Sequence, residues 1–141
     1  MLSKHVLTND PKTWQNAPLI SVTQITPGGL NLIHKTSTSM RTLVRTQKGS
    51  DALKHHVLGT IFYEPSTRTS CSFQSAMLRL GGTFLHVDSL SSSTKKGESA
   101  IDTVKCLESY CAVVVLRHWS AESMRALAAT GARDKPLVNA G

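Results

Sequence analysis

Residues 57–80 contain the pattern that most constrains the fold: an apolar run, a hydroxyl-rich turn and the start of an amphipathic helix. The run at 57–62 reads Val-Leu-Gly-Thr-Ile-Phe, a short, mostly apolar segment with β-branched and aromatic residues that is typical of a buried strand. After the turn, apolar side chains recur at the spacing of one helix face, at Phe73, Ala76, Met77 and Leu80. A buried strand that leads directly into a helix is the repeating unit of α/β proteins.

The same alternation continues along the chain. The apolar patterns and capping signals predict helices at 30–47, 67–80, 99–111 and 121–130, and strands at 57–63, 83–87, 112–116 and 136–140. Strands that alternate with helices indicate an α/β fold, here a three-layer domain with a parallel sheet of four or more strands flanked by helices and joined by right-handed crossovers. We expect this domain to span residues 19–141. Residues 1–18 carry a turn signal and no apolar period, which is typical of a tail or interdomain linker.

Composition limits the classes of function. The longest purely apolar run, at 112–116, is far too short to cross a membrane, and the first 16 residues lack the apolar segment of a secretory signal. The three cysteines form no CxxC pair, so free thiols in a reducing, cytoplasmic compartment are expected. The net charge of +7 favours anionic partners. Because the basic residues are dispersed and aromatics make up only 5%, we expect no nucleic-acid partner.

The turn before the second helix has the chemistry of a phosphate cradle. It reads Ser66-Thr67-Arg68-Thr69, and it lies where the first backbone N–H groups of a helix have no intrahelical partner. Ser66 or Thr67 can cap the helix, and Arg68 offers a planar, charged fork that matches phosphate or carboxylate oxygens. The alternative is an ordinary capped helix with a solvated arginine.

Two further polar groups follow predicted strands. One is the loop at 91–98, which contains Ser92 and Lys96, and the other is the pair Arg117 and His118. Ligands of parallel sheets bind outside the carboxyl ends of the strands, so these groups and the turn at 66–69 are expected to converge on one anion. Alternatives remain open: the loop can be a solvated surface, Arg117 can simply end its strand, and His118 can be structural or an acid–base group. No histidine pair shows metal-ligand spacing such as HExxH.

Taken together, residues 19–141 resemble the N-terminal, carbamoyl-phosphate-binding half of aspartate carbamoyltransferase, also called aspartate transcarbamylase. The resemblance is carried by an ordered set of motifs: FYEPSTRTS at 62–70, SF at 72–73, MLRLGG at 77–82, KGES at 96–99, DT at 102–103, VVLRH at 114–118 and VNAG at 138–141. The form is similar to the eukaryotic one, which is often a module of a larger pyrimidine-synthesis polypeptide.

The resemblance implies the conversion of carbamoyl phosphate and L-aspartate into N-carbamoyl-L-aspartate and phosphate by a homotrimer, without metal or organic cofactor. It places Ser66, Thr67, Arg68 and Thr69 on the phosphate. Thr69 and Arg117 match residues that also polarise the carbamoyl oxygen. Ser92 and Lys96 match loop residues that reach a neighbouring subunit's site, where Lys96 also serves the aspartate side. The catalytic set is thus Arg68, Thr69, Lys96 and Arg117.

The sequence departs from the family pattern in two places. Trp119 stands where the family usually has proline, and the chain stops before a His-Pro-Thr-Gln segment and the aspartate-binding half. The resemblance therefore implies little or no transferase activity for the isolated chain. An alternative is a non-catalytic, truncated paralogue that binds phosphate metabolites or assembles with a full-length relative. A basic nucleic-acid-binding module rests on charge alone.

Overall fold

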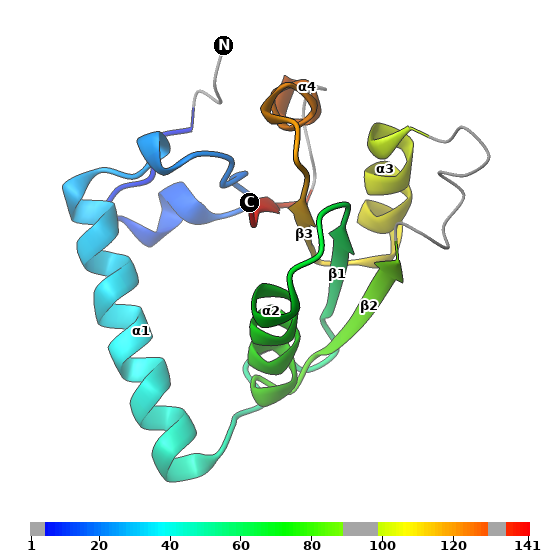
Figure 1. The fold of residues 1–141 in the computed structure, drawn as a ribbon. Coiled ribbons are helices and arrows are strands. Elements are labelled where there is room, and N and C mark those ends of the chain that lie inside the picture. Colours follow the sequence, from blue (N-terminus) through cyan, green and yellow to red (C-terminus); the bar gives the residue numbers. More distant parts are fainter. Residues whose placement is uncertain (1–4, 89–98, 130–134) are drawn as a thin grey trace.

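The computed structural model describes residues 5–88, 99–129 and 135–141. Its centre is a four-stranded sheet in the order β2-β1-β3-β4, and every strand pair is parallel (Figure 1). The strands are β1 (Val57–Phe62), β2 (Thr83–Asp88), β3 (Val113–Arg117) and β4 (Leu137–Asn139). The predicted α/β class and parallel sheet are confirmed.

Helices alternate with these strands as the sequence predicts. They are α1 (Pro27–Gln47), α2 (Thr67–Arg79), α3 (Ala100–Tyr110) and α4 (Ala121–Ala129), preceded by the short 3-10 helices η1 (Pro11–Trp14) and η2 (Val22–Gln24). Helix α1 begins three residues before the predicted start, because Thr26 accepts a hydrogen bond from the Gly29 N–H and Pro27 occupies the first turn.

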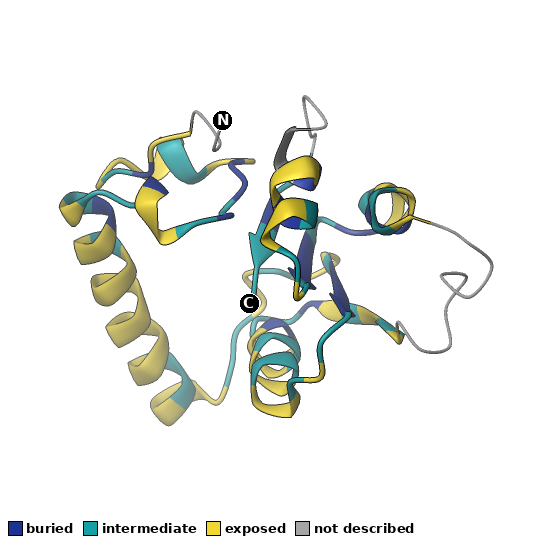
Figure 2. Ribbon diagram, turned by 45° about the horizontal axis from the view of Figure 1, so that its top comes forward, coloured by how far each residue is buried: buried dark blue, intermediate teal, exposed yellow. Residues whose placement is uncertain are grey.

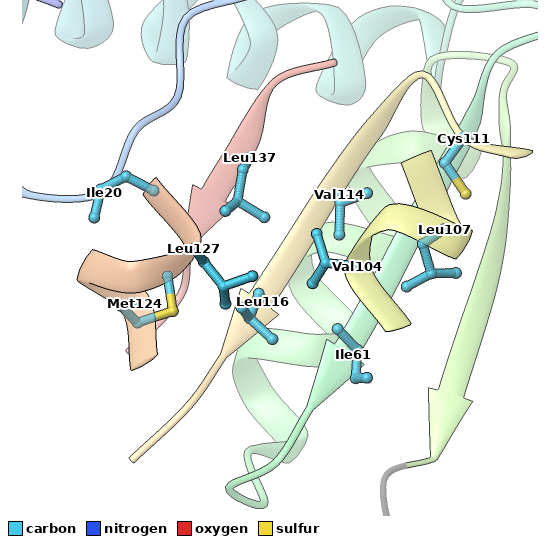
Figure 3. Packing of buried hydrophobic residues seen from close by; sticks show 10 residues of the cluster. All are labelled: Ile20, Ile61, Val104, Leu107, Cys111, Val114, Leu116, Met124, Leu127 and Leu137. Carbon is cyan, nitrogen blue, oxygen red and sulfur yellow. The ribbon is translucent and has the colours of Figure 1, made fainter. Parts of the chain in front are cut away.

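The sheet separates two apolar cores. On one face, α2 covers a cluster made of Leu58, Phe62, Met77 and Val115. On the other face, α3 and α4 cover the larger cluster shown in Figure 3, whose members include Ile61, Val104, Leu116 and Leu127. Central strands with apolar side chains on both faces are expected of a parallel sheet that lies between helices. The expected three-layer arrangement is therefore present.

The N-terminal segment closes one edge of the sheet. Leu19 pairs with Val138 of β4, the Leu19 N–H donates to the Leu137 carbonyl, and the Asn139 side chain donates to the Ile20 carbonyl. Further back, Leu7 is buried and bridges to Ile25. The boundary between residues 1–18 and 19–141 stays a prediction.

Helix α1 stands apart from the sheet and is exposed along most of its length (Figure 2). Its predicted apolar face faces solvent in this structure: Leu30 is 60% exposed, and Ile33 and Met40 are each 37% exposed. Within the described residues, none of the helices combines the length and the apolarity that crossing a bilayer requires.

Candidate functional site

The site lies at the carboxyl ends of the three strands β2, β1 and β3. In the sheet register, Phe62 of β1 is opposite Asp88 of β2 on one side and Arg117 of β3 on the other. The residues that follow Phe62 therefore begin at the same edge where Asp88 and Arg117 end their strands. This edge is where ligands of open parallel sheets bind.

The start of α2 carries no side-chain cap. Ser66 occupies the N-cap position, but its hydroxyl donates to Thr69 Oγ1 at 2.9 Å rather than accepting from a backbone N–H. The expectation that Ser66 or Thr67 caps the helix is wrong, because the hydroxyl of Ser66 is used within the turn. The N–H groups of the first turn thus lack a capping side chain, and the helix dipole adds partial positive charge at that point. This arrangement suits an anion.

A pocket of about 340 Å³ opens beside this helix start. It is lined by Phe62, Tyr63, Pro65, Ser66, Thr67, Ser70, His86 and Asp88. The structure thus brings together the predicted Ser66 and Thr67 with His86 and Asp88, which sequence reasoning missed. The one sequence signal that could have identified these two residues is their position at the end of the second predicted strand. That strand is β2, and it pairs with β1.

The remaining predicted residues take different positions. Arg68 is exposed and makes no hydrogen bond or ion pair with the described residues, and neither Arg68 nor Thr69 lines the pocket. Ser92 and Lys96 lie outside the described residues.

Arg117 is held at the edge of β3 by two partners. One terminal nitrogen donates to Glu64 Oε1 at 2.7 Å, and the other donates to the Ala140 carbonyl at 3.0 Å. Its Nε is buried and has no hydrogen-bond partner among the described residues. For an anion bound here, the Nε of Arg117 is an available donor, whereas one terminal nitrogen of Arg117 already donates to Glu64. Glu64 belongs to the motif at 62–70, but sequence reasoning assigned it no role.

An aromatic cluster adjoins this edge, formed by Tyr63 directly after β1 and by His118 and Trp119 directly after β3. The ring centroids of His118 and Trp119 are 4.4 Å apart, and those of Tyr63 and His118 are 5.0 Å apart. Nδ1 of His118 accepts the Ser120 N–H at 2.9 Å, and burial lowers the pKa of the imidazole below its ordinary value. Both the burial and the accepted hydrogen bond favour the neutral imidazole. Trp119 packs on His118 while staying 68% exposed.

The donors of the site suit a small anion rather than a metal ion. They are backbone N–H groups, hydroxyls and guanidinium groups, which bind phosphate or carboxylate oxygens. In the described ranges, no group of three or more histidine, cysteine, aspartate or glutamate side chains could hold a metal ion.

Comparisons with known proteins agree with this geometry. A family described as "Aspartate/ornithine carbamoyltransferase, carbamoyl-P binding domain" matches residues 18–141. The multifunctional protein pyr1-3 of Dictyostelium discoideum is 48% identical over 123 residues, which cover 87% of this chain and 5% of that protein. The aspartate carbamoyltransferase catalytic subunit of Picrophilus torridus is 38% identical over 128 residues, 90% of this chain and 41% of that subunit.

Solved structures give the same result. The catalytic subunit of M. jannaschii aspartate transcarbamoylase superposes with a TM-score of 0.79 at 38% identity, covering 88% of this chain and 40% of that one. Aspartate transcarbamoylase from Trypanosoma cruzi in complex with carbamoyl phosphate and aspartate gives a TM-score of 0.78 at 28% identity. The match covers 90% of this chain and 41% of that one. The chain thus spans less than half the length of the relatives it matches. It belongs to the aspartate/ornithine carbamoyltransferase family and carries that family's carbamoyl-phosphate-binding domain.

Proposed function

We propose that this chain binds carbamoyl phosphate as the first substrate-binding part of an aspartate carbamoyltransferase. The observation that supports the proposal best is the uncapped start of α2, which opens into a pocket at the carboxyl edge of the sheet. Its N–H groups and hydroxyls are donors for a phosphate, as is the exposed Arg68 beside them. The family match over 18–141 favours carbamoyl phosphate among phosphorylated ligands.

The chemistry follows from the donors. In the proposed reaction, the amine of L-aspartate attacks the carbamoyl carbon, and negative charge grows on the carbonyl oxygen and on the departing phosphate. Donors fixed before the reaction stabilise that charge more strongly than water does. Ser66, Thr67, Arg68 and Thr69 are assigned to the phosphate. Thr69 and Arg117 are assigned to the carbonyl oxygen, and Arg117 has to turn a donor from Glu64 towards it.

The complete enzyme is proposed to need more than this chain. Binding of L-aspartate is assigned to the half that the relatives have in addition. Ser92 and Lys96 are assigned to the site of a neighbouring subunit in a homotrimer, with Lys96 among the catalytic groups. The proposed compartment is the cytoplasm, and no cofactor, membrane or nucleic acid takes part.

Calorimetric titration with carbamoyl phosphate tests the proposal. The wild-type chain is expected to bind, and Arg68→Ala is expected to weaken binding about tenfold or more, because a charge-assisted hydrogen bond contributes about 1.5–3 kcal/mol. Arg41→Ala removes the same charge from exposed α1 and is expected to leave binding unchanged. Absence of binding by a folded wild-type chain, or equal losses in both variants, would refute the proposed role of the α2 start.

A further inference from the structure

Arg117 is held from two sides, and one of its partners is a backbone carbonyl that follows β4. Nη1 of Arg117 donates to the Ala140 carbonyl at 3.0 Å, and Nη2 donates to Glu64 Oε1 at 2.7 Å. A bound anion that draws Nη2 away from Glu64 leaves the Ala140 contact as an anchor of the guanidinium group. The position of Ala140 therefore determines where the other donors of Arg117 point.

Ala140 follows a short strand at the edge of the sheet. Strand β4 has three residues, and the Ala140 N–H continues its pairing with β3 by donating to the Leu116 carbonyl at 2.9 Å. The ends of short edge strands open easily, because few backbone hydrogen bonds hold them. A fixed place for the Ala140 carbonyl thus needs further support, and the residue before it supplies this support.

Asn139 joins the turn after β4 to the N-terminal segment. Its N–H donates to the Leu19 carbonyl at 2.8 Å, and its Nδ2 donates to the Ile20 carbonyl at 2.9 Å. Its Oδ1 accepts the Gly141 N–H at 3.1 Å, on the far side of Ala140. This pair of side-chain contacts requires an amide, since an amide carries both a donor and an acceptor whereas a carboxylate only accepts.

The segment at 18–24, which Asn139 contacts, is a rigid support. Ile20 is buried in the apolar cluster shown in Figure 3, and its N–H donates to Oε1 of Gln24 at 2.7 Å. Gln24 is 5% exposed, and its Nε2 donates to the Pro18 carbonyl at 2.8 Å. A buried amide whose donor and acceptor are both bonded rigidifies the backbone around it. Asn139 therefore ties the turn after β4 to a part of the chain that is itself well held.

We propose that Asn139 is a positioning residue for Arg117. It holds the turn at 139–141 so that the Ala140 carbonyl keeps the guanidinium group at the carboxyl edge of the sheet, where the buried Nε can meet an anion. This inference rests on the proposed function and adds to it a residue that acts on the ligand through Arg117. Asn139 does not line the pocket beside α2, which agrees with an indirect role.

A double-mutant cycle separates positioning from a contribution to folding alone. Calorimetric titrations with carbamoyl phosphate compare the effect of Asn139→Ala in the wild-type chain and in an Arg117→Met chain. Where Arg117 is present, Asn139→Ala is expected to weaken binding about three- to tenfold, a coupling typical of groups in one hydrogen-bond network. In the Arg117→Met chain the same substitution should change binding less than about twofold, because no guanidinium group is left to misplace. Asn31→Ala, on exposed α1, is the matched control and should leave binding unchanged in both chains.

The Nε–H signal of Arg117 in NMR spectra of the ¹⁵N-labelled chain reports the same effect without a ligand. This N–H is buried, so it should exchange slowly with water, and its absence from the Arg117→Met spectrum identifies it. Asn139→Ala is expected to shift the signal and to speed its exchange, whereas Asn31→Ala should do neither.

Circular dichroism checks that each variant is folded. Asn139→Ser carries the test if Asn139→Ala is unfolded, because a serine hydroxyl can still accept an N–H within the turn but is too short to hold Ile20. No loss of affinity, an equal loss in both chains, or an unchanged Nε–H signal in a folded Asn139 variant overturns this inference and leaves carbamoyl phosphate binding intact. Failure of the wild-type chain to bind carbamoyl phosphate overturns the proposed function, and the Nε–H signal alone then decides whether Asn139 positions Arg117.

Discussion

At the scale of single residues, the pairing of Arg117 with Glu64 determines how the site meets an anion. The guanidinium side chain is 24% exposed and the carboxylate 44% exposed, and their contact is 2.7 Å long. A half-exposed ion pair of this kind is weak in water, so a bound anion can compete for the arginine. Glu64 therefore orients Arg117 but still allows its guanidinium to bind an anion. The carboxylate of Glu64 also places negative charge near the site, which opposes anion binding.

Removal of that charge should strengthen anion binding. We expect Glu64→Gln to raise the affinity for inorganic phosphate about two- to fivefold, because Arg117 loses its competing carboxylate. Calorimetric titration at low salt measures the change. Glu122→Gln makes the same change in net charge on α4 and should have a much smaller effect. Equal affinities in wild type and Glu64→Gln would show that Arg117 takes no part in binding the anion.

His118 gives the stability of the chain a pH dependence of defined sign. Burial lowers its pKa from 6.5, so the folded state resists the proton that the unfolded state accepts. The stability associated with the neutral ring is present above pH 6.5 and is lost as the pH falls through the lower, folded pKa. Urea midpoints should therefore drop between pH 7.5 and 5.5, and they should drop less in His118→Asn. His34→Gln, on exposed α1, should show the same decrease in urea midpoint as the wild type. A decrease of wild-type size in His118→Asn would show that His118 is not the source of the pH dependence.

At the scale of elements, much of the fold could be predicted because each element has a local signature. The apolar run of β3 and the apolar spacing of α2 can be recognised directly in the sequence. The alternation of strands with helices along the chain then predicts a parallel sheet. The register between strands has no such signature. For that reason the contacts of Glu64 with Arg117 and of His86 with Thr60 could not be foreseen, although each joins neighbouring strands. The use of Ser66 inside its own turn was equally invisible.

The first turn of α1 offers a test of how the N-terminal segment is attached. A Cβ at Gly29 would collide with the Leu7 carbonyl oxygen, a backbone atom, whereas the atoms nearest to a Cβ at Gly28 belong to Asn9, at 3.3 Å or more. Gly29→Ala is expected to destabilise the chain by about 1–3 kcal/mol, because the backbone of Leu7 has to shift. Gly28→Ala should be neutral or stabilising by up to about 1 kcal/mol, since alanine favours helix. Urea denaturation compares the two, and equal stabilities would contradict this packing.

At the scale of the whole molecule, the chain carries one domain of its family and has a helix that no other described segment covers. It spans 41% of the catalytic subunit of Picrophilus torridus, and the apolar residues Leu30, Ile33 and Met40 of α1 face solvent. The sequence predicted the apolar stripe on α1 but not its exposure, because burial depends on what the rest of the molecule places against it. A complete site for two substrates is therefore expected only in a longer or assembled protein.

The isolated chain is accordingly expected to bind carbamoyl phosphate but not to catalyse the transfer of the carbamoyl group. We expect no formation of carbamoyl aspartate from carbamoyl phosphate and L-aspartate at the rates of ordinary enzymes, about 1–1000 per second. The reason is that the aspartate-binding groups are assigned to the half that this chain does not share with its relatives. A colorimetric ureido assay measures the product, with a complete aspartate carbamoyltransferase as the positive control. Turnover in that range by the chain alone would show that the assignment is wrong.

The central claim is that the start of α2 is an anion cradle, and backbone amide NMR tests it most directly. On addition of carbamoyl phosphate to the ¹⁵N-labelled chain, the amide signals of Thr67, Arg68 and Thr69 should shift most, because their N–H groups have no capping side chain. Amides in the middle of exposed α1 should hardly move. Largest shifts on α1, or at a separate pocket that Lys48 and Arg79 line at the opposite end of α2, would contradict the account.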